Sequence, residues 1–182
     1  NEGDTELGLL EVNKWVIWSV SGSDVVIGAD GAVVLASPAD FETATSHSFT
    51  VTATDTDSNA TTTSTIVVTV TDMNDAPELM GDLFGLIADA GRYKILATDL
   101  FYKDIDDDAA GVIFTTSSEI NGAIQVNGSL TSSFTGKQLS EGVVTFVHDG
   151  SETGTASFAV NVEDGNEDNS TPASSTFNLT VM

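Results

Sequence analysis

The sequence has no cysteine, few basic residues and no long apolar run, and each absence excludes a class of structure or partner. Without cysteine, disulfide bonds and thiolate metal sites are excluded. Against 28 acidic residues there are 5 basic ones, a formal net charge of −23. We therefore expect neither nucleic acid nor anionic membranes as partners. Because no run of about 18 apolar residues occurs, we also expect no direct insertion into a membrane.

The composition still predicts a folded chain. Of the 182 residues, 40% are hydrophobic, which is enough for the core of one medium-sized domain or two small ones. The first four residues have neither a basic start nor an apolar stretch, so we expect no signal peptide. The acidic excess has two readings: adaptation for solubility or high salt, or binding of divalent cations. Whether the acidic residues cluster in the sequence distinguishes these two readings.

The dominant sequence period is two, which is typical of β-strands. Polar and apolar residues alternate in four clear runs, at residues 48–54, 65–71, 142–148 and 157–162. These runs are rich in β-branched residues and are separated by Gly, Asn, Asp and Ser, as in many short antiparallel strands. One buried face per strand favours β-sandwiches. Residues 81–103 alone have a weak helical character, and we expect at most a turn there.

An internal repeat divides the chain into two modules. The pattern at residues 48–51 returns 109 residues later at 157–160, and each copy leads to a strand-end acid, Asp55 or Asp164. Between the copies, Pro77 fixes φ and favours extended backbone at Ala76, which predicts a stiff connection. We predict modules at 1–76 and 77–182, cut from a longer array of repeats.

Acidic residues gather at the predicted strand ends, where stacked sandwiches would meet. Calcium takes six to eight oxygen ligands, so a site must collect acids from several segments. The groups that could supply them are Glu2, residues 40–42, residues 72–75, residues 104–106 and Asp164. The clusters favour divalent cation binding; the alternative is ordinary solvation of strand ends.

Module 1 resembles a bacterial cadherin repeat. Asp40-Phe41-Glu42 stands in the place of the family's Asp-x-Glu motif, and Asp72-Met73-Asn74-Asp75-Ala76-Pro77 in that of its Asp-x-Asn-Asp-x-Pro linker. Glu2 with Gly8, and Ala53-Thr54-Asp55, also match. The resemblance covers nearly all of this module.

Module 2 resembles the cadherin-like repeat of chondroitin sulphate proteoglycans, which also occurs in bacterial adhesins. The match runs through residues 134–139 and 142–152 to Phe158 and residues 162–165. Together the two resemblances imply an all-β fold with two Greek-key β-sandwich modules of cadherin or Ig-like type in tandem. They point to a large bacterial adhesin of the repeats-in-toxin type.

The resemblance implies Ca2+ as the bound ion and a set of ligands around the linker. Carried over to this sequence, the ligands are Glu2, Asp40, Glu42, Asp72, Asn74, Asp75, Asp104, Asp106 and Asp164. Asp149 lies 109 residues after Asp40, so we expect Asp149 and Glu152 to serve a following linker.

The implied function is that of a calcium-dependent extender or adhesion segment at the bacterial cell surface. Its expected partners are neighbouring repeats of the same chain, and in isolation we expect a monomer. Alternatively, the chain is a carbohydrate- or matrix-binding module that contacts host-cell or matrix glycans or proteins. We place Trp18 in the core and Trp15 on the outside; an exposed Trp15 could stack on a sugar, whereas a neighbouring loop could also cover it.

Catalysis is not expected. His148, Asp149 and Ser151 are neighbours along the chain, whereas members of a catalytic triad come from separate elements. With two histidines and no cysteine in the sequence, we also do not expect zinc as the bound metal. We expect His148 to be a strand-end residue that bonds to the following turn.

Overall fold

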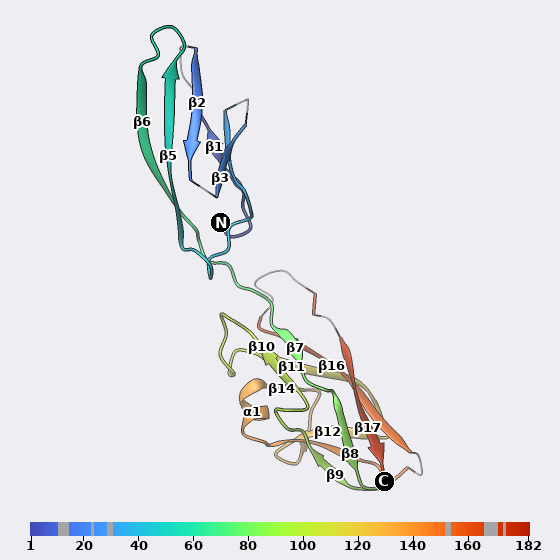
Figure 1. Cartoon of the computed structure of the whole chain (residues 1–182). Coiled ribbons are helices and arrows are strands. Elements are labelled where there is room, and N and C mark those ends of the chain that lie inside the picture. Colours follow the sequence, from blue (N-terminus) through green and yellow to red (C-terminus); the bar gives the residue numbers. More distant parts are fainter. Residues whose placement is uncertain (11–14, 23, 29–30, 152–153, 166–170, 173) are drawn as a thin grey trace. The chain divides into compact units, whose positions relative to one another are not determined.

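The alternating runs of the sequence form strands in the computed structural model (Figure 1). It describes residues 1–10, 15–22, 24–28, 31–151, 154–165, 171–172 and 174–182. The chain separates into two compact units, Asn1–Met73 and Asn74–Met182. This division falls within the predicted connection of residues 72–77, and the module bounds 1–76 and 77–182 remain predictions. Among the described residues, no helix is long and apolar enough to cross a membrane.

The first unit contains two antiparallel three-stranded sheets. One has the order β1-β4-β3 and the other the order β2-β5-β6. The strands are β1 (Glu6–Leu9), β2 (Val16–Ser21), β3 (Val25–Ile27), β4 (Ala32–Leu35), β5 (Ser46–Asp55) and β6 (Thr61–Thr69). Alternation along β5 buries Phe49, Val51 and Ala53, while the residues between them face outward. The predicted strands at 48–54 and 65–71 are therefore confirmed, although β6 begins four residues earlier.

The two tryptophans lie as their alternation predicts. Trp18, on β2, is partly buried and packs against the core of the first unit. The side chain of Trp15 is 89% exposed. Ile17, two residues later, is also exposed, as expected for a residue on the same face of the strand. The alternative in which a loop covers Trp15 is wrong, because its side chain is almost fully open to solvent.

The second unit has a larger sandwich. Its sheets have the orders β14-β11-β16-β17-β8 and β13-β12-β15-β9, with a separate pair of β7 and β10. The strands are β7 (Glu78–Met80), β8 (Phe84–Ile87), β9 (Arg92–Lys94), β10 (Phe101–Lys103), β11 (Ile113–Ile120), β12 (Gly122–Val126), β13 (Ser129–Leu130), β14 (Ser133–Thr135), β15 (Val144–His148), β16 (Thr155–Glu163) and β17 (Ser175–Val181). Among the described strands of this unit, all pairs are antiparallel except β17 with β8, which is parallel.

Stacked aromatic rings fill the core of the second unit. The rings of Phe146 and Phe158 are 5.7 Å apart, and those of Phe158 and Phe177 are 5.0 Å apart. All three side chains are fully buried. The internal repeat extends to the pairing, because Phe49 faces Ile66 in the first unit as Phe158 faces Phe177 in the second.

The one helix of the described residues, α1 (Gly136–Ser140), lies outside the region with predicted helical character. Residues 81–103 instead hold β8, β9 and β10 with turns between them. The helix starts with a capping box: Thr135 Oγ1 accepts from the Gln138 N–H, and the Gln138 side chain accepts from the Thr135 N–H. The nearly all-β sandwich fold that we predicted is confirmed.

Candidate metal centres

The first cluster of acids lies in the first unit and consists of Glu2, Asp40 and Glu42. Carboxylate oxygens from the three side chains lie within 4.8 Å of one another. Backbone hydrogen bonds hold the N-terminal segment beside the turn after β4: the Gly3 N–H donates to the Ala39 carbonyl at 2.8 Å. The fold thus brings together acids that are 38 to 40 residues apart in the sequence.

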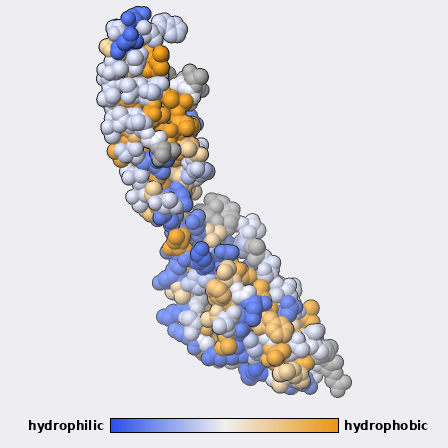
Figure 2. Space-filling view, viewed as in Figure 1, coloured by the Kyte–Doolittle hydropathy of each residue, from blue (hydrophilic) through white to orange (hydrophobic). Residues whose placement is uncertain are grey.

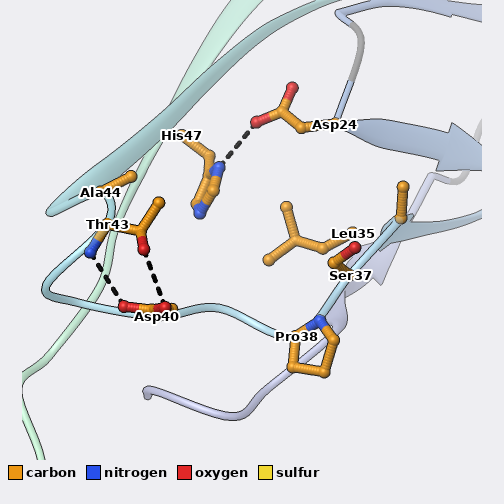
Figure 3. Close-up of a pocket in the computed structure, with 9 residues that line it drawn as sticks. Asp24, Leu35, Ser37, Pro38, Asp40, Thr43, Ala44 and His47 are labelled. Carbon is orange, nitrogen blue, oxygen red and sulfur yellow. Dashed lines mark hydrogen bonds and ion pairs between the residues drawn. The ribbon is translucent and has the colours of Figure 1, made fainter.

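Hydrogen bonds orient two of these carboxylates. Asp40 accepts from the hydroxyl and the backbone N–H of Thr43, both at 2.8 Å (Figure 3), and these bonds lower the pKa of Asp40. The Glu2 carboxylate accepts from the backbone N–H groups of Phe41 and Met73, each at 3.3 Å. Glu2 therefore links the turn of the cluster to the end of the segment that leads out of the unit.

The mutual repulsion of the acids in the first cluster is seen in the pKa of Glu42. A backbone hydrogen bond lowers its pKa, but desolvation and the negative charges of Glu2 and Asp72 outweigh that bond, so the net shift in the pKa of Glu42 is upward. A carboxylate whose pKa rises because of neighbouring carboxylates is the one that a bound cation would stabilise most directly.

A second cluster lies in the second unit and consists of Asp104, Asp107 and Asp164. Their carboxylate oxygens also lie within 4.8 Å of one another. Asp104 follows β10, and its Oδ1 accepts from the backbone N–H groups of Asp106 and Asp107 at 2.8 and 2.7 Å. Asp164 follows β16 and is 8% exposed. The turn at Asp104 thus directs Asp107 toward the end of β16.

The connecting segment is tied to this second cluster. The side-chain amide of Asn74 donates to Asp164 Oδ2 at 2.6 Å, and the Asp75 N–H donates to Asp106 Oδ2 at 2.8 Å. Asn74 and Asp75 therefore lie beside the predicted acids of the same unit. Asp107 is missing from the predicted ligand set, although the run of acids from 104 to 108 contained the signal.

One atom of the second cluster has the surroundings that a cation ligand requires. Asp104 Oδ2 is buried and has no hydrogen-bond partner among the described residues. A buried, unpaired carboxylate oxygen beside two further carboxylates is unfavourable unless a cation neutralises it. The donors are all oxygens, which suits a hard cation such as Ca2+ better than a metal that prefers nitrogen or sulfur.

His148 and Asp149, which are not in the predicted ligand set of the linker, are held by turns of the second unit. His148 ends β15, and its Nδ1 accepts from the backbone N–H groups of Ala90 and Gly150, so the predicted bond to the turn is confirmed. Asp149 accepts from the hydroxyl and the backbone N–H of Ser151, which lower the pKa of Asp149. Glu152, its predicted companion, lies outside the described residues.

A cavity of about 290 Å3 lies beside the first cluster in the first unit (Figure 3). His47 Nδ1 lies 2.6 Å from Asp24 Oδ2, and this hydrogen bond lowers the pKa of Asp24. Ser37 also lines the cavity, but the buried Nε2 of His47 has no hydrogen-bond partner within the described ranges, so Asp24, His47 and Ser37 do not form a hydrogen-bonded triad.

Comparisons with solved structures identify the same sandwich in tandem cadherin repeats. The structure of human protocadherin-24 EC1-2, form II, has a TM-score of 0.58 and 15% identity, and the match covers 93% of this chain and 83% of that one. Mouse protocadherin-24 EC1-3 has a TM-score of 0.56 and 18% identity, covering 100% and 58%. Domains 3-6 of protocadherin gamma B2 have a TM-score of 0.60 and 12% identity, covering 98% and 42%.

At these identities the likeness concerns the fold. No curated protein matches the chain. A family model described as Cadherin-like matches residues 85–181, which is just over half of the sequence and almost all of the second sandwich. With that match, two sandwiches in series and the acids at their strand ends, the chain belongs to the cadherin-like family.

Proposed function

We propose that this chain is an extender segment of a large bacterial surface adhesin of the repeats-in-toxin type. In this role, Ca2+ held by the acidic clusters stiffens the connection at residues 72–77. Neighbouring repeats of the same chain continue the array, which holds a distal binding region away from the cell. The role is mechanical and requires no catalytic group.

The family gives the first support. Cadherin-like domains are in general extracellular, adhesion-related and calcium-binding. A chain without disulfide bonds needs another means of stiffening a series of small sandwiches, and a bound cation can supply it. A net charge of −23 also makes the folded chain repel itself unless cations offset the charge.

The buried Oδ2 of Asp104 is the observation that carries the proposal. In the part of the chain that the structure describes, it has no hydrogen-bond partner, and it lies in a group of three carboxylates. Surface solvation explains exposed acids, but it does not explain an oxygen that is both buried and unpaired. A cation at this place would satisfy the oxygen and remove the repulsion among the three charges.

Two consecutive residues of the connecting segment are each hydrogen-bonded to an acid of their own unit. The Met73 N–H donates to Glu2 in the first unit, and the Asn74 amide donates to Asp164 in the second. Cation binding that orders each cluster would therefore order the adjoining backbone. The proposed ligands are Glu2, Asp40, Glu42 and Asp72 from the first unit, and Asn74, Asp75, Asp104, Asp106, Asp107 and Asp164 from the second.

Small-angle X-ray scattering tests the mechanical part of this proposal. With saturating Ca2+ we expect a narrow distribution of intramolecular distances, and with chelator a broader one. The matched control is NaCl at equal ionic strength, which screens charge without filling the sites. Identical distance distributions with Ca2+ and with chelator would contradict the proposal.

A second candidate function rests on Trp15, whose side chain is 89% exposed. An open aromatic ring at a strand end can stack on a sugar, as a carbohydrate- or matrix-binding module would require. A glycan array with wild type and Trp15→Ala, both at millimolar Ca2+, tests it. Binding that Trp15→Ala loses would favour this function, and an array without signal would count against it.

A further inference from the structure

Strand β2 lies at an edge of its sheet in the first unit. In the sheet order β2-β5-β6 it pairs with β5, and among the described residues no strand pairs with its other side. Residues 15–22 contain neither a charged side chain nor a proline, the features that usually protect an edge. The free backbone N–H and C=O groups of such a strand can pair with a further strand.

The internal repeat shows what covers the matching edge in the second unit. The sheet orders make β11 and β16 the counterparts of β2 and β5. Ile17 stands opposite Thr54, and Ile113 stands opposite Glu163, which lies 109 residues after Thr54, so Ile113 is the counterpart of Ile17. From Ile113 onward, β14 pairs with the outer side of β11 in antiparallel direction. This edge of the fold therefore accepts an antiparallel strand at the position of Ile17.

The difference between the two edges comes from an insertion inside the second unit. There, β14 belongs to residues 127–143, which join β12 to β15. In the first unit the counterparts of β12 and β15 are β3 and β4, and residues 28–31 alone join them. So short a connection cannot supply a strand such as β14 together with the turns that lead into and out of it.

Two large apolar side chains stand beside this edge on the outer face of the sheet. Trp15 is 89% exposed and Ile17 is 62% exposed, and both face away from the core. In Figure 2 the apolar side chains of the first unit gather toward β2 and β3, whereas the side along β6 is pale. Adjacent exposed apolar side chains are typical of a contact surface. Two copies with a net charge of −23 each repel one another least where such an uncharged strand meets its equal.

We propose that two copies of this chain associate through antiparallel pairing of their β2 strands, with a two-fold axis at Ile17. This register places Ile17 opposite its equivalent, and Trp15 of one copy opposite Ser19 of the other. Trp15 and Ile17 of both copies then form one apolar cluster on the outer face of a continuous sheet. The contact is isologous, so it closes as a dimer. It departs from the monomer that the sequence led us to expect.

Cross-linking tests the register. The chain has no cysteine, so Ile17→Cys introduces a single thiol. Opposite residues in an antiparallel pair have Cβ atoms about 5 Å apart, close to disulfide range, so we expect Ile17→Cys to form a covalent dimer under mild oxidation. Ser19→Cys is the matched control, because Ser19 is exposed on the same face of the same strand. In this register the two copies of residue 19 lie about 14 Å apart along the strands, beyond disulfide range, so the control should stay monomeric.

Sedimentation velocity over a concentration series, at saturating Ca2+, tests the association itself. We expect wild type to show a monomer–dimer equilibrium. Ile17→Lys, which places two like charges on the axis, should weaken it about tenfold or more, whereas Thr65→Lys, exposed on β6 at the other side of the same sheet, should leave it unchanged. The variant Asp72→Ala with Asp75→Ala should keep the dimer, so loss of the calcium site and loss of the contact are separable. Wild type that stays monomeric, or equal effects of both lysine variants or both cysteine variants, would overturn the proposal.

Discussion

Replacing Asp104 by asparagine removes one negative charge from the cluster of Asp104, Asp107 and Asp164. The turn should survive, because asparagine keeps the Oδ1 that accepts from the backbone N–H groups of Asp106 and Asp107. The buried oxygen without a partner becomes an amide group, which can donate to the neighbouring carboxylates. We expect the change to stabilise the chain in chelator and to weaken its response to calcium.

The size of the effect follows from the separation of the charges. At the 4.8 Å limit of the cluster, two carboxylates repel by about 1 kcal/mol in bulk water and about 3.5 kcal/mol at a dielectric constant of 20. The variant removes two of the three repelling pairs. Allowing for screening by salt, we expect about 1–2 kcal/mol of stabilisation in chelator. For a unit of this size that is about 4–8 °C in Tm.

Calcium offsets this advantage of the variant. At a free Ca2+ concentration about 100 times Kd, wild type gains about 2.7 kcal/mol. The variant has one carboxylate ligand fewer, so we expect roughly half of that gain or less. Differential scanning calorimetry of both proteins, with calcium and with chelator, measures all four values.

Asp108→Asn is the matched control for this experiment. Asp108 lies in the same acidic run, is exposed, and uses Oδ1 to accept from the Ala110 N–H, but it is not part of the cluster. It should change neither Tm nor the calcium response appreciably. If Asp104→Asn destabilises the chain in chelator, or responds to calcium as wild type does, the cluster is not a cation site.

Two further predictions concern the first unit. In chelator, the raised pKa of Glu42 means that the folded chain keeps this proton to higher pH than the unfolded chain, so stability should fall as pH rises above 4.5; Glu42→Gln should flatten this slope in pH-dependent thermal unfolding, and an unchanged slope would assign it to other groups. Trp18→Ala should cost about 3 kcal/mol, because the side chain packs against the core, whereas exposed Trp15→Ala should cost under about 0.5 kcal/mol; equal losses in urea unfolding would contradict this packing.

Alternation and the repeat were sufficient to predict the sandwich fold. The burial of Phe49 and Phe158 at matching positions follows from a period of two and a 109-residue repeat. The short helix was missed, although Thr135 and Gln138 have capping-box spacing before Leu139. No element was predicted for residues 136–140, because five residues are too few to show a helical period.

The sequence was sufficient to identify candidate acidic ligands, but not to show which of them lie together in the fold. The motif around Asp40 and Glu42 pointed to the first cluster. In the second cluster, the sequence could not show which side chains of the 104–108 run face Asp164. That choice depends on the turn at Asp104, where two backbone N–H groups bind Oδ1 and direct Asp107 inward. Spacing alone does not encode such a turn.

Thermal unfolding of wild type and of the variant Asp72→Ala with Asp75→Ala, each with calcium and with chelator, tests the central claim most directly. Both residues belong to the segment that joins the two units. We predict a large rise in Tm with calcium for wild type and a much smaller rise for the variant. An equal calcium response in both proteins, or none in wild type, would contradict a calcium-stiffened connection.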